Sequence, residues 1–567
     1  MLKNHWQLRA AVSLAAILIP AYAQAQDAQS DRLQRQLDAL QKQVESQQKQ
    51  VETQQKQVES LQKQLAESKK REAAQAQAQA PADAAYAADA KMPMKVKAPP
   101  APGIKMTWGG FLAAESVYRQ HNTVSDMGTP FTSIPYPFSP QYSEHEFRGS
   151  ARQSRLSLLV EGSIDPTEKL AGYYEMDFLG TGVTSNYNQS NSWDLRLRQA
   201  FLEYDNSSYG FHLMAGQGWS MATQNTVGII PRKENVPLTI ESNYVAGFDY
   251  LRNWQLRFVG DWGSVFWTGI SLENPAEQVF TGAGAIGNGG TLNGLLVNWA
   301  NPGNSFLGSG SFVNNFNTET APDVIGKIAV DPGPWGHFEG LGMVRFFTDS
   351  VFTCAPVTVA ATGACTTAGA VALTPGSANS QVTTGWGVGG SVLLHPVPQI
   401  LDLQGSVLYG KGIGRYGASQ LSDVVVQSDG TLSPITALHA LVGAVLHPMP
   451  GTDIYGYAGL ERADTNLFTA GVGLGGIVGF GNPNVVNTGC GIVTNASFAG
   501  GTNNCAAVNK EVDMVTVGFW QNIWKGSYGR VAAGAQWEYI QRKSFDTVVG
   551  NGGSVSTNDN VFLTYPF

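Results

Sequence analysis

The chain ends with Asp559-Asn560-Val561-Phe562-Leu563-Thr564-Tyr565-Pro566-Phe567. In this stretch Val561, Leu563, Tyr565 and Phe567 occupy alternate positions. Because side chains alternate between the two faces of a β-strand, one face of this strand is wholly apolar. A soluble sheet would have to cover that face with a core, and the chain ends without adding one. Such a stretch is typical of the last strand of a membrane β-barrel, which seals the barrel.

The composition of the whole chain agrees with this interpretation. The 567 residues include 65 Gly, 13 Trp, 19 Tyr and 25 Phe, and only 14% are charged. Long loops, many short strands and aromatic girdles would give such a composition. No continuous apolar run is long enough for a membrane-spanning helix, which needs about 20 residues. The formal charge of −8 is small for this length and predicts no nucleic-acid partner.

Residues 1–25 have the pattern of a secretory signal peptide. Lys3 and Arg9 form a basic head, residues 10–19 are apolar, and small residues near 21–25 offer a cleavage site. A membrane anchor is the alternative, but an apolar run of about ten residues is too short to span a bilayer as a helix. We therefore expect the mature protein to be exported.

Residues 27–71 carry a heptad repeat and are expected to form an α-helical coiled coil. Heptad position a holds Leu37, Val44, Val51, Val58 and Leu65, and position d holds Leu40, Gln47, Gln54 and Leu61. β-Branched residues at a favour two strands, whereas the two Gln at d suit a wider, three-stranded core, so both states stay open. Residues 72–103, rich in Ala, Gln and Pro, are expected to be a linker.

Residues 104–567 are expected to form an all-β transmembrane barrel of about 16 antiparallel strands. Alternation and turn residues place these strands near 105–120, 153–163, 168–180, 194–206, 209–218, 251–261, 264–273, 321–331, 335–349, 380–396, 399–411, 435–449, 451–464, 510–525, 526–543 and 558–567. Long Gly- and Asn-rich loops alternate strictly with short turns. This asymmetry is typical of bacterial outer-membrane barrels, and an even strand number allows closure.

All four cysteines lie in the long loops of the barrel region. Cys354 is expected to pair with Cys365, and Cys490 with Cys505, each pair within one loop. An even number of cysteines in an exported chain favours disulfides. A metal site is the alternative, but the cysteines lack the paired spacing that metal sites use.

Alternation also assigns charged side chains to the barrel interior. The sequence predicts that the following residues line the pore and bind anions: Arg155, Arg196, Arg198, Arg257, Arg232, Lys233, Glu175 and Asp177. Arginine facing lipid at mid-depth costs roughly 2–4 kcal/mol, so inward placement is favoured. In the alternative interpretation the arginines only pair with Glu175 and Asp177 and stiffen the wall. The register of strand 194–206 also turns Gln199 and Glu203 outward, which predicts a subunit interface or a β-bulge there.

The third long loop, 219–250, contains Arg232 and Lys233. In many general porins the corresponding loop folds into the lumen and narrows it. By analogy we expect the same placement here.

Several motifs resemble those of the DcaP-like outer-membrane porins and, more distantly, the phosphate-selective porins. The resemblance rests on Trp108-Gly109-Gly110-Phe111, Arg155-Leu156, Tyr174-Glu175-Met176-Asp177-Phe178 and Leu195-Arg196-Leu197-Arg198-Gln199-Ala200, and on the preceding heptads. It implies a trimer of 16-stranded barrels whose coiled coil projects into the periplasm. It also implies uptake of small anionic solutes such as dicarboxylates. The nearly uncharged loop 274–320 departs from the expected pattern.

The function expected from the sequence is passive diffusion of small hydrophilic solutes, with a preference for anions, through an outer-membrane porin. The expected partners are the lipid bilayer, lipopolysaccharide and two further copies of the chain, joined through the barrel wall and the coiled coil. A surface adhesin is the second class and a barrel-rim hydrolase the third. Neither catalysis, a cofactor nor a metal ion is expected, since no defensible set of a charged residue, a histidine and a nucleophile is present.

Overall fold

The computed structural model describes residues 103–180, 193–281, 319–353, 379–469, 476–493, 505–527 and 529–565, and six short strand pieces between residues 291 and 371. The chain divides after Pro99 into two compact units, and the second unit holds all described residues. The expected signal peptide (1–25), coiled coil (27–71), almost all of the linker (72–103), the Cys354–Cys365 pair and Phe567 lie outside the described residues.

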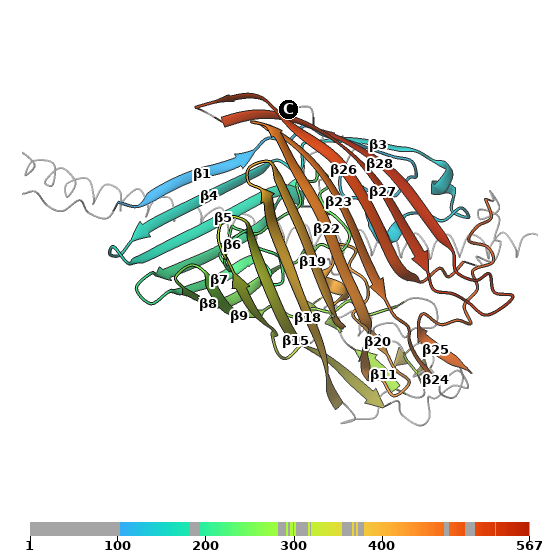
Figure 1. Ribbon diagram of the computed structural model, residues 1–567. Coiled ribbons are helices and arrows are strands. Elements are labelled where there is room, and N and C mark those ends of the chain that lie inside the picture. Colours follow the sequence, from blue (N-terminus) through green and yellow to red (C-terminus); the bar gives the residue numbers. More distant parts are fainter. Residues whose placement is uncertain are drawn as a thin grey trace, which may run out of the picture. The chain divides into compact units, whose positions relative to one another are not determined.

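Twenty strands join in a single sheet, and every recorded pairing in it is antiparallel (Figure 1). The strands are β1 (Lys105–Phe111), β2 (Glu115–Arg119), β3 (Glu146–Ser150), β4 (Arg155–Ser163), β5 (Glu168–Gly180), β6 (Asp194–Asn206), β7 (Phe211–Trp219), β8 (Arg252–Trp262), β9 (Phe266–Glu273), β10 (Thr291–Leu292), β11 (Leu295–Asn298), β14 (Asp323–Val330), β15 (Gly336–Thr353), β18 (Asn379–Val397), β19 (Leu401–Lys411), β22 (Thr436–Met449), β23 (Thr452–Ala463), β26 (Asn509–Gly526), β27 (Gly529–Ser544) and β28 (Ser556–Tyr565). The expected all-antiparallel β fold is confirmed.

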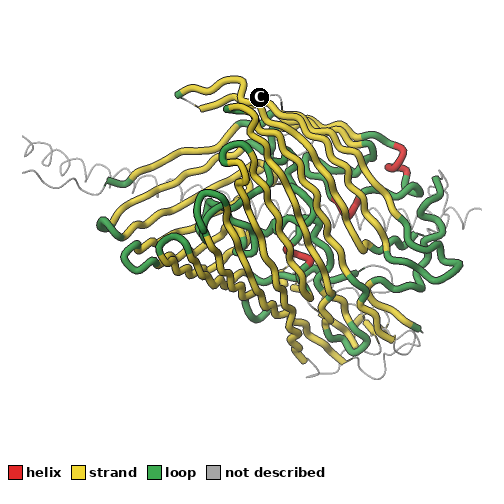
Figure 2. Tube along the Cα trace, viewed as in Figure 1, coloured by secondary structure: helices red, strands yellow, loops and turns green. Residues whose placement is uncertain are grey.

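Within the described residues, the connections contain four two-stranded pairings and three single-turn 3-10 helices (Figure 2). The pairings are β12 (Ala300–Asn301) with β13 (Phe316–Asn317), β16 (Thr366–Thr367) with β17 (Ala370–Val371), β20 (Val424–Val426) with β21 (Leu432–Pro434), and β24 (Asn466–Thr469) with β25 (Ile477–Phe480); the 3-10 helices are η2 (Phe131–Ser133), η3 (Pro140–Ser143) and η6 (Gly414–Tyr416). Within the described ranges, no helix is long and apolar enough to cross a membrane.

Short turns and long loops alternate between the strands, as the sequence predicts. In this count β1 with β2 and β3 with β4 are each taken as one strand, and the short β10 and β11 are left out. Seven short turns span 164–167, 207–210, 263–265, 331–335, 398–400, 450–451 and 527–528. Eight long connections span 120–145, 181–193, 220–251, 274–322, 354–378, 412–435, 464–508 and 545–555. All short turns therefore lie at one end of the sheet and all long loops at the other, because antiparallel neighbours reverse direction at each connection.

The pairings follow chain order and bring the two ends of the sheet together. Beginning at β4, each long strand pairs with the next long strand along the chain. These pairings include β9 with β14 and β23 with β26, and the last one is β27 with β28. β28 then pairs with β2, where Thr564 lies opposite Ser116 and Val561 opposite Arg119. β2 also pairs with β3, while β1 pairs with β4. The first and last segments of the sheet are therefore neighbours.

The two faces of the sheet have the reverse of the polarity that a soluble protein would show. On β5, the apolar side chains of Tyr174 and Phe178 are exposed, while Glu175 and Asp177 are buried. On β6, Leu195 and Leu197 are 56% and 44% exposed. A soluble β-sheet buries its apolar face, whereas a membrane barrel turns that face to lipid and its polar face inward.

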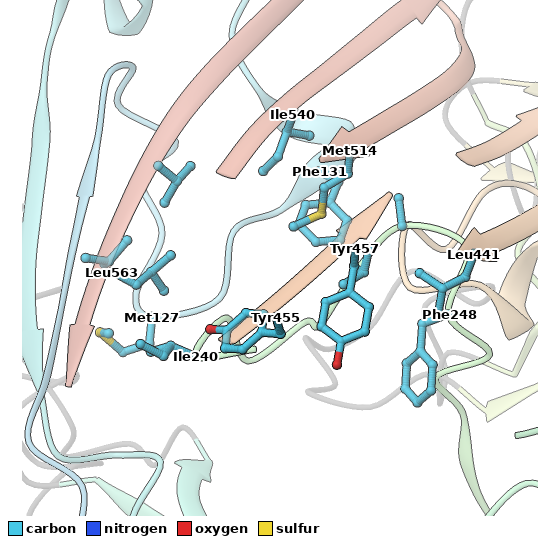
Figure 3. Close-up of a cluster of buried hydrophobic side chains, with 14 of the residues drawn as sticks. Met127, Phe131, Ile240, Phe248, Leu441, Tyr455, Tyr457, Met514, Ile540 and Leu563 are labelled. Atoms are coloured by element: carbon cyan, nitrogen blue, oxygen red, sulfur yellow. The ribbon is translucent and has the colours of Figure 1, made fainter. Parts of the chain in front are cut away.

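The C-terminal strand is an exception to this polarity and corrects one part of the sequence interpretation. Val561 and Leu563 are fully buried and Tyr565 is nearly so, while Phe562 on the opposite face is 48% exposed. The buried face packs in a cluster with Met127 of loop 120–145 and Ile240 of loop 220–251 (Figure 3). The expectation that nothing covers this face was wrong, because loops from early in the chain return to provide the core.

Candidate functional site

Three arginines and two carboxylates meet on the inner face of β4, β5 and β6. Arg155 begins β4, Glu175 and Asp177 lie on β5, and Arg196 and Arg198 lie on β6. The register places Arg155 opposite Asp177 on one side and Arg196 opposite Asp177 on the other. Cross-strand neighbours on one face are close enough for direct contact. The sequence prediction that these five residues share a face agrees with this geometry.

The contacts within this group are short and charge-assisted. Arg196 binds Asp177 with two parallel hydrogen bonds, Nε to Oδ1 at 3.0 Å and Nη2 to Oδ2 at 2.8 Å. Arg198 donates from Nε to Glu175 Oε1 at 2.7 Å and from Nη1 to Asp177 Oδ2 at 2.8 Å. Arg155 Nη1 lies 3.7 Å from Glu175 Oε2. Wall-stiffening pairs therefore exist, as the alternative interpretation requires.

The same arginines differ in how much water they can reach. The side chain of Arg196 is 37% exposed and that of Arg155 is 24% exposed, whereas Arg198 is only 5% exposed. A guanidinium that is paired on one edge still has free N–H groups on its other edge. Arg155 and Arg196 therefore keep N–H groups that water can reach, whereas Arg198 is almost enclosed.

A β-bulge in β6 brings Arg198 and Gln199 into the buried layer together. Glu175 pairs with Gln199 and Met176 pairs with Leu197, so Arg198 is the extra residue between them. One extra residue shifts the alternation that follows it by one position. As a result Gln199 and Glu203 are buried, at 5% and 6% exposure. Of the two explanations left open by the sequence, the bulge is therefore confirmed.

Loop 220–251 runs along the inner face and is hydrogen-bonded to strands far from its own. The loop connects β7 to β8, yet Asn225 N donates to Glu339 Oε1 on β15 at 3.0 Å. Leu238 N donates to Tyr457 Oη on β23 at 3.1 Å. Partners on such distant strands lie on one inner face, so the loop crosses the interior. This agrees with the analogy to the constriction loop of general porins.

Arg232 and Lys233 occupy this loop but behave differently from each other. Arg232 Nη2 donates to Glu203 Oε2 on β6 at 3.1 Å, and its guanidinium lies 5.7 Å from the Tyr173 ring. Its backbone is in the left-handed region with φ of 66°. Lys233 is exposed, and among the described residues no carboxylate lies within ion-pair distance of it. Arg232 is thus joined to β6 through Glu203, whereas Lys233 is not.

Arg257, by contrast, is enclosed by the loop. It is 2% exposed, and its Nη2 donates to the carbonyl of Trp219 at 2.7 Å while Nε donates to Gln255 Oε1 at 3.0 Å. The inward placement expected from alternation agrees with this position. The buried guanidinium of Arg257 holds the start of loop 220–251 in place, so a solute cannot reach it.

Arg252 and Tyr244 complete the group, and sequence reasoning missed both. The guanidinium of Arg252 lies 4.8 Å from the Trp219 ring, and its buried Nη1 has no hydrogen-bond partner in the described structure. Burial acts to raise the pKa of the Tyr244 hydroxyl in the loop. The charges of Arg198, Arg252 and Arg155 outweigh burial and lower this pKa below its ordinary value. Tyr244 therefore lies among three guanidinium groups.

We define the arginine cluster as Arg155, Arg196, Arg198 and Arg252 together with Glu175 and Asp177. Alternation on β8 assigns Arg252 to the same face as the exposed Trp254, so the sequence pattern gave no reason to place it inside. Arg252 lies near the cluster, since its charge acts on Tyr244 together with the charges of Arg198 and Arg155. Four cations against two anions leave the cluster an excess of two positive charges.

A second set of charged groups, also not predicted, lies at the short-turn end. His212 lies between Asp205, 2.6 Å from Nδ1, and Asp261, 3.1 Å from Nε2. Equivalent arrangements hold His337 between Asp331 and Glu339, His447 between Asp453 and Asp402, and His395 beside Asp402. Each of these histidines has one carboxylate partner six or seven positions away across a short turn. The second partner of His212 and of His447 comes from a neighbouring strand, whereas that of His337 lies two positions along its own strand.

One of the two expected loop disulfides lies within the described residues. Cys490 and Cys505 are joined, as expected from their position in one loop. Cys354 and Cys365 lie outside the described residues, so that pair stays a prediction.

A polar inner face, an apolar outer face and a long loop inside the sheet define a porin-type fold. That fold is shared by the outer membrane channel DcaP of Acinetobacter baumannii, which is 16% identical, with a TM-score of 0.50 over 83% of this chain and 99% of that chain. OmpT of Vibrio cholerae is 8% identical, with a TM-score of 0.38 over 84% of this chain and 100% of that one. The anion-selective porin from Comamonas acidovorans is 11% identical, with a TM-score of 0.37 over 82% and 100%.

The resemblance to DcaP-like porins that the sequence predicts is therefore confirmed at the level of the fold. No protein-family model and no curated protein matches the chain.

Proposed function

We propose that the chain is an outer-membrane porin with a closed ring of sixteen strands. β1 and β2 are two halves of one strand interrupted at 112–114, and β3 and β4 are two halves of another interrupted at 151–154. The short strands β10 and β11 lie beside the end of β15 and are not counted as separate strands of the ring. The twenty strands of the sheet then reduce to sixteen, and the β28–β2 pairing supports closure. Closure leaves no unpaired edge toward lipid.

The pore prefers anions, and the arginine cluster is the observation that carries this proposal. Its excess of two positive charges lies on the inner face, where exposed edges of Arg155 and Arg196 meet the lumen. Rings of basic side chains favour anions in pores. The planar fork of a guanidinium also matches the geometry of a carboxylate. Small dicarboxylates are therefore the proposed solutes, in line with the family resemblance.

The remaining parts of the proposal come from the sequence. The signal peptide directs export, the long loops face outward, and the linker joins the barrel to a periplasmic coiled coil. Three copies associate through the barrel wall and the coiled coil, and the outer wall contacts lipid and lipopolysaccharide. Two glutamines at heptad position d support the trimeric state.

Single-channel recording in a planar bilayer under a potassium chloride gradient tests the proposal. We expect regular conductance steps and a reversal potential that indicates chloride preference, and Arg196→Gln should shift that potential toward potassium. Arg462→Gln is the matched control, because Arg462 is exposed on the opposite face of β23 and pairs only with Asp464. Steps that favour potassium in the unaltered protein would overturn the anion preference but keep the pore. Absence of conductance from folded protein would overturn the porin itself.

A further inference from the structure

A pocket of about 380 Å³ lies among the long loops and shares no residue with the arginine cluster. Its walls come from loops 120–145, 274–322, 412–435 and 464–508 and from Arg542 on β27. Small-molecule sites in proteins have volumes of about 300–1,000 Å³ and combine apolar walls with a few polar groups. This pocket has both features.

Arg542 supplies a positive charge without a matching carboxylate. Its Nη1 donates to the carbonyl of Thr132 and lies 3.4 Å from Asn509 Oδ1. Its guanidinium lies 4.3 Å from the centre of the Tyr136 ring. Nε is buried and has no hydrogen-bond partner, and no described carboxylate lies within ion-pair distance of this arginine. A half-buried cation with a free N–H donor favours an anionic ligand.

Tyr136, whose ring lies against the Arg542 guanidinium, supplies a second donor. The residue is 2% exposed, yet its hydroxyl has no hydrogen-bond partner within the described structure. Buried polar groups in folded proteins are normally hydrogen-bonded, and each exception calls for a physical explanation. A single carboxylate could accept a hydrogen bond from each of these two unpartnered donors, one of which is charged.

The rest of the wall combines aromatic rings with the polar residues Gln420, Ser422 and Asn509. Phe280 and Phe480 meet edge to face, with ring centroids 5.0 Å apart and planes at 81°. Val508 and Phe138 line the same space. Aromatic rings pack favourably against another ring in edge-to-face or offset geometry. The body of the ligand should therefore be a flat apolar group.

The wall is held in place before any ligand binds. The disulfide between Cys490 and Cys505 fixes the segment that leads to Val508. The carbonyl of Cys490 also accepts a hydrogen bond from Phe138 N at 3.2 Å. A site that is already ordered loses less conformational entropy on binding.

We propose that this pocket binds a small aromatic monocarboxylate. The carboxylate accepts hydrogen bonds from Arg542 Nε and Tyr136 Oη, and the ring lies among Phe280, Phe480 and Val508. This site is independent of conduction and of the anion preference of the pore.

Isothermal titration of the detergent-purified full chain with phenylacetate tests the site. We expect saturable binding that Arg542→Gln weakens by about tenfold or more, because a charge-assisted hydrogen bond is lost. Tyr136→Phe should weaken binding by a smaller factor, and the neutral analogue phenylacetamide should bind less tightly than phenylacetate. Arg462→Gln is the control on the outer face and should bind like the unaltered protein.

Arg196→Gln separates the site from the pore, because it should change the reversal potential and leave phenylacetate binding unaltered. If Arg542→Gln fails to fold, Ser422→Trp replaces it by filling the pocket without changing its charge. Absence of saturable binding overturns the proposal. So does binding that neither Arg542→Gln nor Ser422→Trp weakens, since the ligand would then sit elsewhere.

Discussion

Gly459 of β23 lies directly against the backbone of Ala246 in loop 220–251. A Cβ added at Gly459 would clash with the carbonyl oxygen of Ala246. The next loop residue, Gly247, has φ of 82° and donates its N–H to Glu461 Oε1 at 2.8 Å. The loop backbone therefore packs on the wall at a position that has no side chain, and the wall strand sets how far the loop extends into the interior.

Replacing Gly459 should displace the loop. Gly459→Ala is expected to lower the free energy of unfolding by about 1–3 kcal/mol, as overpacking of a filled interior does. It should also change the single-channel conductance, because the loop must move into the lumen. Thermal unfolding, followed by gel migration of unheated samples, measures the first effect. Gly456→Ala is the control, since the added Cβ would meet Val517 at an ordinary 3.6 Å.

The Asp177 carboxylate allows the two roles of the arginine cluster to be distinguished. Asp177→Asn removes one negative charge beside Arg196 and Arg198 with little change in shape. We expect a stronger preference for chloride in the reversal potential and a loss of about 1–3 kcal/mol in the free energy of unfolding. If the arginines only stiffen the wall, stability will fall and the reversal potential will not change. Asp464→Asn, at an exposed pair, should alter neither quantity.

A buried ion pair anchors the other side of the loop. Lys327 Nζ lies 2.9 Å from Glu339 Oε1 and donates to the carbonyl of Thr223 in the loop at 2.8 Å. Lys327→Met leaves the Glu339 charge buried without this cation, so we expect a loss of about 3–5 kcal/mol in the free energy of unfolding. The double variant Lys327→Met/Glu339→Gln should recover part of that loss. A double variant as unstable as the sum of both single variants would contradict this coupling.

Two loop carboxyls should make stability depend on pH. Burial, then the hydrogen bond and charge of Glu319, raise the pKa of Glu277 above its ordinary value of 4.5. A carboxyl whose pKa is raised by folding stabilises the fold fully below pH 4.5, and this contribution is lost as the pH rises toward the raised value. Unfolding temperature should therefore fall from pH 5 to alkaline pH, and Glu277→Gln should flatten the dependence. An unchanged pH profile in the variant would assign the dependence to other groups.

Much of the fold follows from local sequence pattern. The ranges 168–180 and 194–206 coincide with β5 and β6, because alternating residues and flanking turn residues act over a few positions. The same alternation placed Arg155 and Asp177 on one face. It could not choose between a bulge and an interface near Gln199, because a bulge turns the polar side chain inward and an interface covers it where it is, and both fit the same sequence.

What the pattern could not supply was the path of the long loops. The apolar face of Val561 and Leu563 looked uncovered because its cover comes from Met127 and Ile240, more than 300 positions earlier. Arg252 shares the alternation of the exposed Trp254, so periodicity alone gave no sign that it lies near the arginine cluster. Such contacts depend on tertiary placement, which periodicity does not encode.

The pairing of β2 with β28 has a consequence for the order of folding. Ser116 and Thr564 are hydrogen-bonded through their side chains at 2.7 Å although they are separated by 448 positions. Contacts between such distant positions carry the largest loop-closure entropy and form slowly. The four-residue junction at β2 therefore forms only after the complete chain has emerged and the intervening hairpins have paired. Until then β28 exposes an unpaired edge, and an unpaired edge is the part of a sheet that is most open to aggregation.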